Sequence, residues 1–411
     1  MHKVMVFPCG SQVAQEVSDS LYCRRDVYLI GVGSRDCPAY GSYDEVRHIG
    51  SSVGHRYLGR DLLRISREVG AECLFACNDS AHLQISGSCA KSILVGSSHA
   101  TSKTLSLKSS TYSALRAKLP VPITGRKVSL PAFVKPDRGS GSKGCWVAES
   151  RSELRRVRED ELACELVSGE EFTTDCFTDR SGRLLVCSSR RRDEIRSGMS
   201  VRTSMQADPG LRHYAEVIND TFALRGGWFF QTILRASGEH VVIEVNPRIA
   251  SCSGATRASG ANLALMSMMD HLGVDVEPSI CCEVASQTKI FHNGISLAEE
   301  FSDLFVDFDD CLLLRHGLNS GLLRFIFDCK NRGKRVSVIS KHRGNLAERL
   351  RRLGIDRIFD RVIHLKHGES KSKHLHRGAL LVDDSFRERQ EASATCQCLS
   401  PDVFTNGELV F

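Results

Sequence analysis

No stretch of the chain approaches the roughly 20 consecutive apolar residues that a membrane-spanning helix needs. The opening MHKVMVFPCG holds too short an apolar run for a secretory signal peptide. Internal repeats and low-complexity tracts are also lacking. We therefore expect a cytoplasmic protein without a membrane partner.

A large excess of one charge is lacking as well. The 55 basic and 49 acidic residues leave a formal net charge of only +6. The strongest basic run, Arg190 to Arg192, is followed at once by Asp193 and Glu194. Because nucleic-acid binding needs a basic stripe, we predict no nucleic-acid partner. The run is instead interpreted as a solvated or phosphate-facing local patch.

Cysteines are plentiful, but no disulfide framework or zinc spacing is visible. The 17 cysteines are an odd number scattered along a chain of 411 residues, which favours reduced thiols. Close neighbours such as Cys73 and Cys77 do not form the two-pair spacing of a zinc site. With 41% apolar residues, the chain can form two or three domains around real cores.

Short apolar runs alternate with helical patterns over residues 1–100, which predicts an N-terminal α/β domain with a parallel sheet. The predicted strands are Val4–Phe7, Val27–Val32, Cys73–Ala76 and Ile93–Val95, with a helix over Asp61–Val69. Loops at the carboxyl ends of such strands are available for ligands.

Residues 101–285 mix strands and helices in an α+β pattern. The predicted strands are Ala132–Lys135, Leu184–Cys187, Phe229–Leu234 and Val241–Val245, and the predicted helices are Ser152–Arg158, Leu211–Phe222 and Leu263–Leu272. Residues 300–411 predict a second doubly wound sheet. Its strands are expected at Leu304–Phe308, Val336–Ser340, Arg361–Leu365 and Ala379–Val382. The fold class is thus α/β and α+β, in several domains.

An apolar strand ending in Lys135 is followed by the loop Gly139-Ser-Gly-Ser-Lys-Gly144. Glycines let backbone N–H groups approach phosphate oxygens, and Lys135 would add a fixed positive charge beside them. An ordinary surface hairpin would give the same pattern. The loop is not a P-loop, because no Lys-Ser/Thr pair opens a helix after it.

The segment VVIEVNPR is more specific. Glu244 and Asn246 lie two residues apart, so both side chains point to one face of a strand, where Gln231 of the preceding strand can join them. Oxygen ligands of this kind suit Mg²⁺, whose site substrate phosphates would complete. Arg248 follows, where a transferring phosphoryl group would need charge stabilisation. The alternative is an edge strand with a solvated polar face.

Together these motifs resemble the ATP-grasp superfamily, in particular its biotin carboxylase, carbamoyl phosphate synthetase and D-alanine–D-alanine ligase branch. The resemblance covers about residues 1–285 and implies a pre-ATP-grasp domain over 1–100 and an ATP-grasp domain over 101–285. It implies phosphate contacts by Lys108 and Lys135 and a mobile loop over the triphosphate. The loop residues are Gly139, Ser140, Gly141, Ser142 and Gly144.

The same resemblance implies recognition of adenine by Glu165 and the backbone at Val167, and of ribose by Glu171. Gln231, Glu244 and Asn246 match the metal ligands, so ATP and Mg²⁺ or Mn²⁺ are the expected cofactors. Gln231 is neutral where many relatives have an acid.

The implied activity joins a small-molecule carboxylate to an amine. A carboxylate attacks the γ-phosphate of ATP, and an amine then displaces phosphate from the acyl phosphate. No glutamine-hydrolysing domain is visible, so a free amine is expected as the second substrate. The sequence leaves the oligomeric state open, a homodimer included.

In the last segment, polar side chains follow several predicted strands. Asp307 and Asp309 end one strand, Ser340 another, and Asp383 with Asp384 a third, while Lys371 opens a predicted helix. Because strand ends of one parallel sheet share a crevice, these groups suit Mg²⁺ and phosphate.

This pattern resembles the haloacid dehalogenase (HAD) superfamily of phosphatases over residues 300–411. The resemblance implies Asp307 as nucleophile, Asp309 as general acid and base, and Ser340 and Lys371 as phosphate contacts. It also implies a metal site formed by Asp307, Asp309, Asp383 and Asp384. Cys311 stands where Thr or Val is more usual. A purely structural domain is the alternative. For the whole chain, two rivals are a phosphatase with a regulatory nucleotide-binding body and a scaffold with two silent sites.

Overall fold

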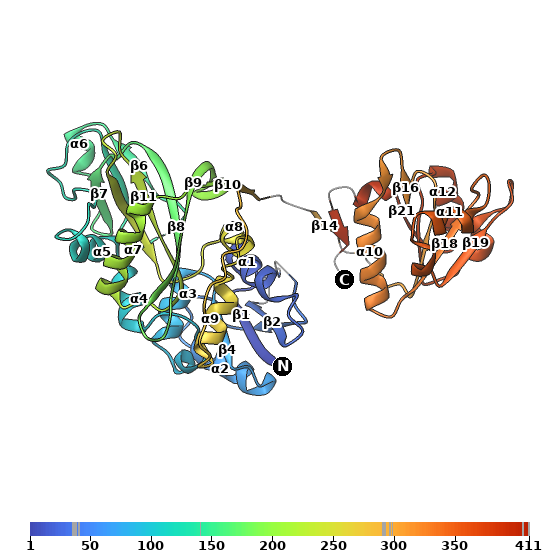
Figure 1. Ribbon diagram of the computed structural model, residues 1–411, viewed down its shortest axis with the longest axis horizontal. Coiled ribbons are helices and arrows are strands. Elements are labelled where there is room, and N and C mark those ends of the chain that lie inside the picture. The colour runs from blue at the N-terminus through green and yellow to red at the C-terminus, as the bar shows by residue number, and fades with distance from the viewer. Residues whose placement is uncertain are drawn as a thin grey trace. The chain divides into compact units, whose positions relative to one another are not determined.

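The structure is a computed structural model that describes residues 1–34, 39, 42–139, 141–289, 293–295, 297, 299–404 and 407–409. The chain divides into two compact units, Met1–Lys289 and Ile290–Phe411 (Figure 1). Among the described residues, no helix combines the length and the apolar composition that crossing a membrane would require. Each unit contains its own sheets and its own apolar core.

The first unit begins with a parallel four-stranded sheet in the order β3-β2-β1-β4. Its strands are β1 His2–Phe7, β2 Val27–Ser34, β3 Glu45–Ile49 and β4 Cys73–Ala76. Its helices are α1 Gln12–Leu21, α2 Leu58–Val69 and α3 Asp79–Ser86. The predicted strand Ile93–Val95 is wrong, because only an isolated bridge between Leu74 and Leu94 forms there. The sequence prediction missed β3, whose middle residues are exposed at the sheet edge.

A six-stranded sheet in the order β12-β11-β8-β9-β10-β13 forms the centre of the first unit. Its strands are β8 Glu170–Thr178, β9 Leu184–Arg196, β10 Met199–Met205, β11 Gly226–Leu234, β12 His240–Asn246 and β13 Ser286–Thr288. Phe172, Trp228 and Phe230 share a core with residues of helix α7 (Pro209–Phe222). Neighbouring residues of a strand alternate between the two faces of a sheet. The polar residues of these strands therefore point to the face that does not pack against α7.

A small sheet, β6-β5-β7, carries the predicted lysine strand. Its strands are β5 Ala132–Pro136, β6 Trp146–Ala148 and β7 Glu161–Glu165, and helix α6 Arg151–Leu154 follows β6. Helices η1 Cys89–Ser92, α4 His99–Leu105 and α5 Lys108–Leu115 precede β5 in the chain. The predicted helix Ser152–Arg158 is too long. Ser150 and Glu153 form a capping box that starts α6, and the helix ends after one turn.

The four-stranded sheet and the later part of the first unit share one core. Val4 and Phe75 of the parallel sheet cluster with Leu263 and Met268 of helix α9 (Leu263–His271). The short helix α8 (Gly254–Ala258) precedes α9. Residues 1–289 therefore form one compact unit, and the expected boundary near residue 100 stays a prediction.

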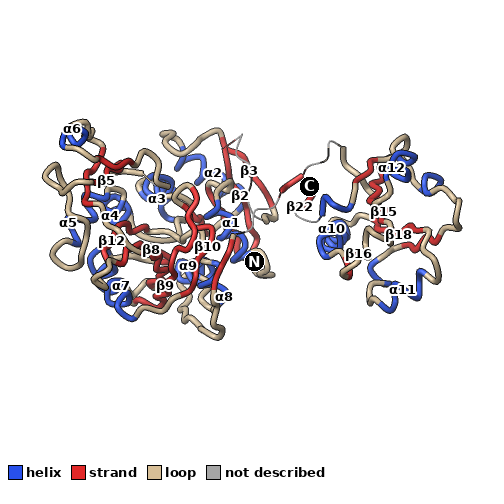
Figure 2. Tube along the Cα trace, turned by 90° about the horizontal axis from the view of Figure 1, so that it is seen from above, coloured by secondary structure: helices blue, strands red, loops and turns tan. Residues whose placement is uncertain are grey.

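The second unit is built on a parallel five-stranded sheet in the order β19-β18-β15-β20-β21. Figure 2 labels two of its neighbouring strands, β15 and β18, in red. Its strands are β15 Asp303–Val306, β18 Arg335–Ser340, β19 Arg361–His364, β20 Ala379–Val382 and β21 Gln397–Leu399. Helices α10 (Ser320–Asn331) and α11 (Leu346–Arg352) contribute to the core on one face, and α12 (Phe386–Ala392) to the core on the other. From β15 the chain adds β18 and β19 on one side and then returns to add β20 and β21 on the other, so the strand order reverses between β15 and β20. This is the switch point where ligands bind in doubly wound sheets.

Shorter elements complete the second unit. A hairpin of β16 (Leu313–Leu314) and β17 (Gly317–Leu318) follows β15, and β14 (Asn293–Ile295) pairs with β22 (Gly407–Leu409). The remaining turns are η2 Asp356–Ile358, η3 Lys371–His374 and η4 Pro401–Phe404. The helix predicted to open at Lys371 is thus only a 3₁₀ turn.

Candidate functional site

The lysine expected at the phosphates lies at the end of β5 and is buried, with 8% of its surface exposed. Its Nζ donates a hydrogen bond to the Tyr112 hydroxyl at 2.7 Å, and that hydroxyl donates to the Ile243 carbonyl at 2.6 Å. Burial lowers the pKa of Lys135. The contact with Tyr112 therefore holds the ammonium group beside β12, a role for this tyrosine that the sequence analysis did not predict.

Lys108 and the glycine loop come together. Lys108 is the first residue of α5, and its Nζ donates to the Gly139 carbonyl at 2.7 Å. Gly141 and Gly144 adopt left-handed φ angles of 69° and 73°, which favour glycine. Ser140, which was expected to contact phosphate, lies outside the described residues, and Ser142 has a φ of 55°.

The expected metal ligands share one face of the six-stranded sheet. Gln231 is directly opposite Glu244 in the antiparallel register, and Phe229 is opposite Asn246. Directly opposed residues point to the same face, so the register brings Gln231, Glu244 and Asn246 to one surface. This donor set of oxygen atoms fits Mg²⁺.

A cavity of about 310 Å³ lies at the edge of β12. Lys108, Gly139, Glu244 and Asn246 line it, together with Asp79 at the start of α3. The structure therefore brings four of the predicted residues around one space. Lys135 and Gln231 are not among the lining residues, although Tyr112, the partner of Lys135, is.

Arg248 lies beside this cavity but is engaged by Asp79. Its Nε and Nη2 donate to the two carboxylate oxygens at 2.8 and 2.9 Å. The guanidinium also lies over the Phe229 ring, 5.3 Å from its centroid. A direct contact of Arg248 with a phosphoryl group remains a prediction.

The two carboxylates expected at adenine and ribose are ion-paired and do not line the cavity at β12. Glu165 binds Arg235, and Glu171 binds Arg192. Val167 lies half-buried between β7 and β8. Glu171 and Arg192 also line an open hollow of about 630 Å³ that is distinct from the cavity at β12. Contacts of Glu165, Val167 and Glu171 with adenine and ribose stay predictions.

The basic run Arg190–Arg192 was interpreted from the sequence as either a solvated or a phosphate-facing patch, and the structure contradicts the solvated alternative. Arg190 is 1% exposed and ion-paired with Asp175, whose Oδ2 also accepts from Thr256 at 2.8 Å. The side chain of Arg192 is also buried, whereas Arg191 is exposed enough to bind Glu170. The alternation along β9 could have predicted this, because residues 190 and 192 share a face.

His82 of α3 is another buried group that the sequence prediction missed. Its Nδ1 is 2.9 Å from the Ser102 hydroxyl, and its Nε2 has no hydrogen-bond partner among the described residues. It lines a small cavity of about 20 Å³ with Arg248 and Ser267. Burial lowers the pKa of His82 to about 4.

We expect this histidine to destabilise the first unit in acid. The unfolded chain protonates it below pH about 6.5, whereas the folded chain does so only near pH 4, so stability falls as the pH drops through this window. The loss should reach about 3 kcal/mol at most. Urea unfolding followed by the fluorescence of the two tryptophans, Trp146 and Trp228, measures this unit alone. His82→Gln should lose less stability than the wild type between pH 7 and 4.5, and an equal loss would contradict the prediction.

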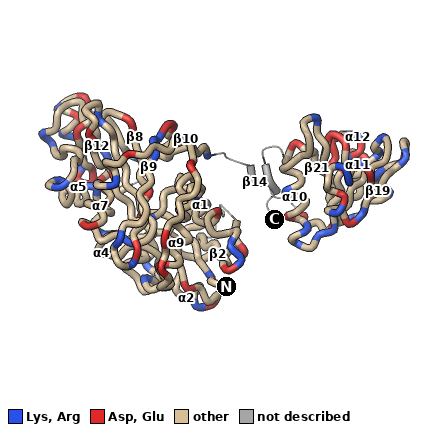
Figure 3. Tube along the Cα trace, viewed as in Figure 1, with Lys and Arg blue, Asp and Glu red and all other residues tan. Residues whose placement is uncertain are grey.

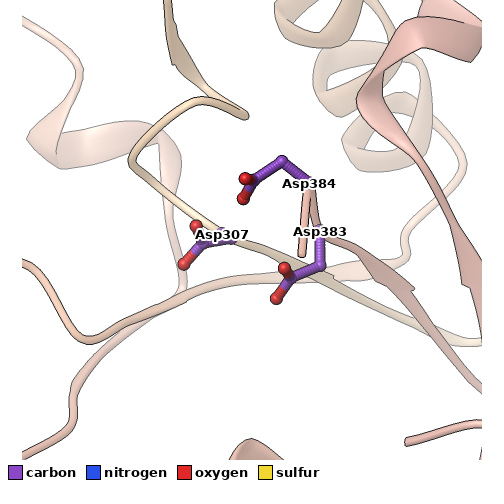
Figure 4. Close-up of side chains that lie close together, drawn as sticks. All are labelled: Asp307, Asp383 and Asp384. Atoms are coloured by element: carbon purple, nitrogen blue, oxygen red, sulfur yellow. The ribbon is translucent and has the colours of Figure 1, made fainter. Parts of the chain in front are cut away.

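The second unit gathers carboxylates at its switch point (Figure 4). Asp307 follows β15, and Asp383 and Asp384 follow β20. One oxygen from each carboxylate lies within 4.8 Å of the others, an arrangement that fits a divalent cation. Asp309 was expected here too, but it is not part of this group.

Lys371 neutralises part of this charge. Its buried Nζ donates to Asp307 and to Asp383, at 2.6 Å each. Burial raises the pKa of Asp307 to about 6. The positive charge of Lys371 and a hydrogen bond from the Ser340 hydroxyl to Asp307 act in the opposite direction and lower this pKa. Burial and the neighbouring Asp383 also raise the pKa of Asp384. Ser340, Lys371 and three carboxylates therefore meet as the sequence predicted.

Asp309 lies toward a residue that the sequence analysis did not single out. Its carboxylate is 2.8 Å from Nδ1 of His342, which packs edge-on against the Phe308 ring. Side-chain exposure is 48% for Asp309 and 17% for His342. Asp309 is thus held at the rim and free to face solvent, while Asp307 lies at the bottom of the site.

Comparison with known proteins adds a family match. Residues 158–290 match the family described as ATP-grasp in the biosynthetic pathway with Ter operon. The N-terminal section of the carbamoyl phosphate synthase large chain of Methanopyrus kandleri is 30% identical over 174 residues. That match covers 37% of this chain, and the chain spans only 30% of the length of that relative.

Solved structures share the fold. The biotin carboxylase domain of the 2-oxoglutarate carboxylase of Hydrogenobacter thermophilus superposes with a TM-score of 0.57 at 16% identity, covering 67% of this chain and 71% of that one. An L-amino acid ligase from Bacillus licheniformis has a TM-score of 0.55 at 15% identity, with coverages of 66% and 74%. The expected mixed α/β architecture with an ATP-grasp-like fold is supported at this level.

Proposed function

We propose that the first unit is an ATP-dependent ligase of the ATP-grasp type, which joins a small-molecule carboxylate to an amine. The observation that carries the proposal is the cavity at β12, where Lys108, the glycine loop, Glu244 and Asn246 meet within a chain that matches an ATP-grasp family. The named activities of the similar proteins, carbamoyl phosphate synthase and L-amino acid ligase, are consistent with this class.

In this proposal, Lys108 and Lys135 contact the phosphates of ATP, with the backbone of the glycine loop over them. Glu244 and Asn246, assisted by Gln231, would hold Mg²⁺ or Mn²⁺, which would supply charge neutralisation for the phosphates. The substrate carboxylate attacks the γ-phosphate, releasing ADP. An amine then displaces phosphate and forms the amide. The protein supplies position and charge, with no covalent nucleophile of its own.

Glu244→Gln tests the metal role. The substitution is nearly isosteric but removes the charge of one oxygen ligand, so we expect ADP release to fall by about two orders of magnitude with the fold unchanged. Glu239→Gln is the matched control, because Glu239 precedes the same strand and binds Arg235 at the surface. ADP release is measured over a panel of amino and keto acids with amines. Activity that survives excess EDTA would rule out the metal assignment.

We propose that the second unit is a HAD-like phosphatase. The close approach of Asp307, Asp383, Asp384 and Lys371 at the switch point carries this part of the proposal. Asp307 attacks the phosphorus of a monoester and becomes an aspartyl phosphate while the alcohol leaves with a proton from Asp309. Asp309 then removes a proton from the water that hydrolyses the aspartyl phosphate. A divalent cation at the three carboxylates would offset the repulsion between Asp307 and the incoming phosphate.

A further inference from the structure

Three neighbouring loops of the second unit share one sequence pattern. Each carries two adjacent basic residues followed by a glycine. The three triplets are Arg315-His316-Gly317, His342-Arg343-Gly344 and Lys366-His367-Gly368. The glycines have φ angles of 123°, 105° and 89°, a region that favours glycine, so each basic pair immediately precedes a left-handed turn.

These loops lie at the same edge of the sheet as the carboxylates. They follow β15, β18 and β19, which are adjacent and parallel, so their carboxyl ends form one continuous row. Hydrogen bonds join the row: His342 contacts Asp309, and the His364 ring contacts the His342 carbonyl at 2.9 Å. The basic pairs therefore form one surface beside Asp307, which we call the basic rim.

The outward members of the rim are available to a ligand. Arg315, Arg343 and Lys366 are exposed, and their side chains make no ion pair or hydrogen bond with any other residue that the structure describes. On the other side of the carboxylates, beside α12, the cations already have protein partners. Lys341 binds Glu388, and Arg389 donates to the Asp383 and Asp384 carbonyls at 2.7 Å. Figure 3 marks Lys and Arg in blue, several of them beside β19.

A phosphate monoester bound at Asp307 and Lys371 must place its alcohol portion over the mouth of the site. On one side, the cations already have protein partners; on the other, the rim offers exposed positive charge. We propose that the substrate of this site is a small phosphate monoester with a second anionic group, a phosphate or a carboxylate, which binds Arg343 and Lys366. This inference rests on the proposed phosphatase function of the second unit.

Hydrolysis by the full-length chain tests the rim. Glycerol 3-phosphate has one anionic group, whereas 3-phosphoglycerate, 2,3-bisphosphoglycerate and fructose 1,6-bisphosphate have two or more, at different spacings. We expect kcat/KM to be at least about tenfold higher for one or more of the latter, and this advantage to shrink as salt is raised from 0.05 to 0.3 M, since exposed charges are screened. Arg343→Gln combined with Lys366→Gln should remove the advantage through KM and leave glycerol 3-phosphate unaffected.

Arg361→Gln is the matched control, because Arg361 is an exposed cation at the opposite end of β19. Equal kcat/KM values for all four esters, or equal losses in Arg361→Gln and the double variant, would overturn the rim while leaving the phosphatase intact. If no ester is hydrolysed, the phosphatase proposal fails separately. In that case, calorimetric binding of 2,3-bisphosphoglycerate and fructose 1,6-bisphosphate tests whether the basic rim binds anionic groups. Weaker binding in the double variant supports this role, and unchanged or absent binding overturns it.

Discussion

Replacing Lys135 by alanine is expected to reduce ATP turnover by about 30-fold to several thousandfold. Removing one partner of a buried charged contact costs about 2–5 kcal/mol, and each 1.4 kcal/mol corresponds to tenfold. Lys135 is buried at the end of β5 and oriented by Tyr112, so no exposed cation can take its place without rearrangement. Calorimetric binding of ADP with Mg²⁺ measures the loss of nucleotide affinity. ADP release with the panel of acids and amines measures the loss of turnover.

Lys127→Ala is the matched control, since Lys127 is an exposed lysine shortly before the same strand. Tyr112→Phe keeps the ring but removes the hydroxyl that accepts from Lys135, so it should weaken nucleotide binding less than Lys135→Ala does. Circular dichroism verifies the fold of each variant. Unchanged nucleotide affinity and turnover in Lys135→Ala would remove this lysine from the phosphate site.

Replacing Asp307 by asparagine should abolish phosphate ester hydrolysis, with a loss of at least about a thousandfold, because the amide cannot form the aspartyl phosphate. ADP release by the first unit should stay nearly unchanged, since the two units have separate cores. The assay compares wild type and variant with Mg²⁺ on a panel of phosphorylated metabolites.

Asp328→Asn serves as the control, because Asp328 lies on α10 and pairs at 4.0 Å with the exposed Arg324. Equal rates for wild type and Asp307→Asn on every ester would show that the second unit is structural. A parallel loss of ADP release in Asp307→Asn would mean that the two activities are coupled, contrary to the prediction.

The sequence predicted the strands that carry the sites because their apolar runs are buried and bounded by turns. Cys73–Ala76 and Ala379–Val382 have the predicted limits, and Asp307 meets Asp383 because parallel strands share one edge. The partners of the charged groups were not predictable in the same way. Arg248 binds Asp79, which is 169 positions earlier, and nothing near either residue in the chain specifies that pairing.

At two places, the local sequence pattern held information about the structure that the sequence analysis did not use. The alternation of residues 190 and 192 places two arginines on the face that also carries Asp175. The triplet of two basic residues and a glycine occurs four times in the second unit. Three copies follow β15, β18 and β19, whereas His376-Arg377-Gly378 precedes β20 and so lies at the opposite edge of the sheet, a difference that depends on strand order and that the sequence alone does not specify. Glu165 and Glu171 show the opposite case, because the ion pairs with Arg235 and Arg192 depend on tertiary packing.

The shared core of the first unit also has a consequence for the order of events during synthesis. Strands β1, β2 and β4 are complete once residue 76 has been made, yet part of one face of their sheet is covered by α9, which ends at residue 271. At about 5–20 residues per second, a ribosome needs roughly 10–40 s to make the intervening segment. During that time the apolar side chains of Val4 and Phe75 lack the cover of Leu263 and Met268. The nascent chain is therefore most exposed to aggregation before the last helix of this unit leaves the ribosome.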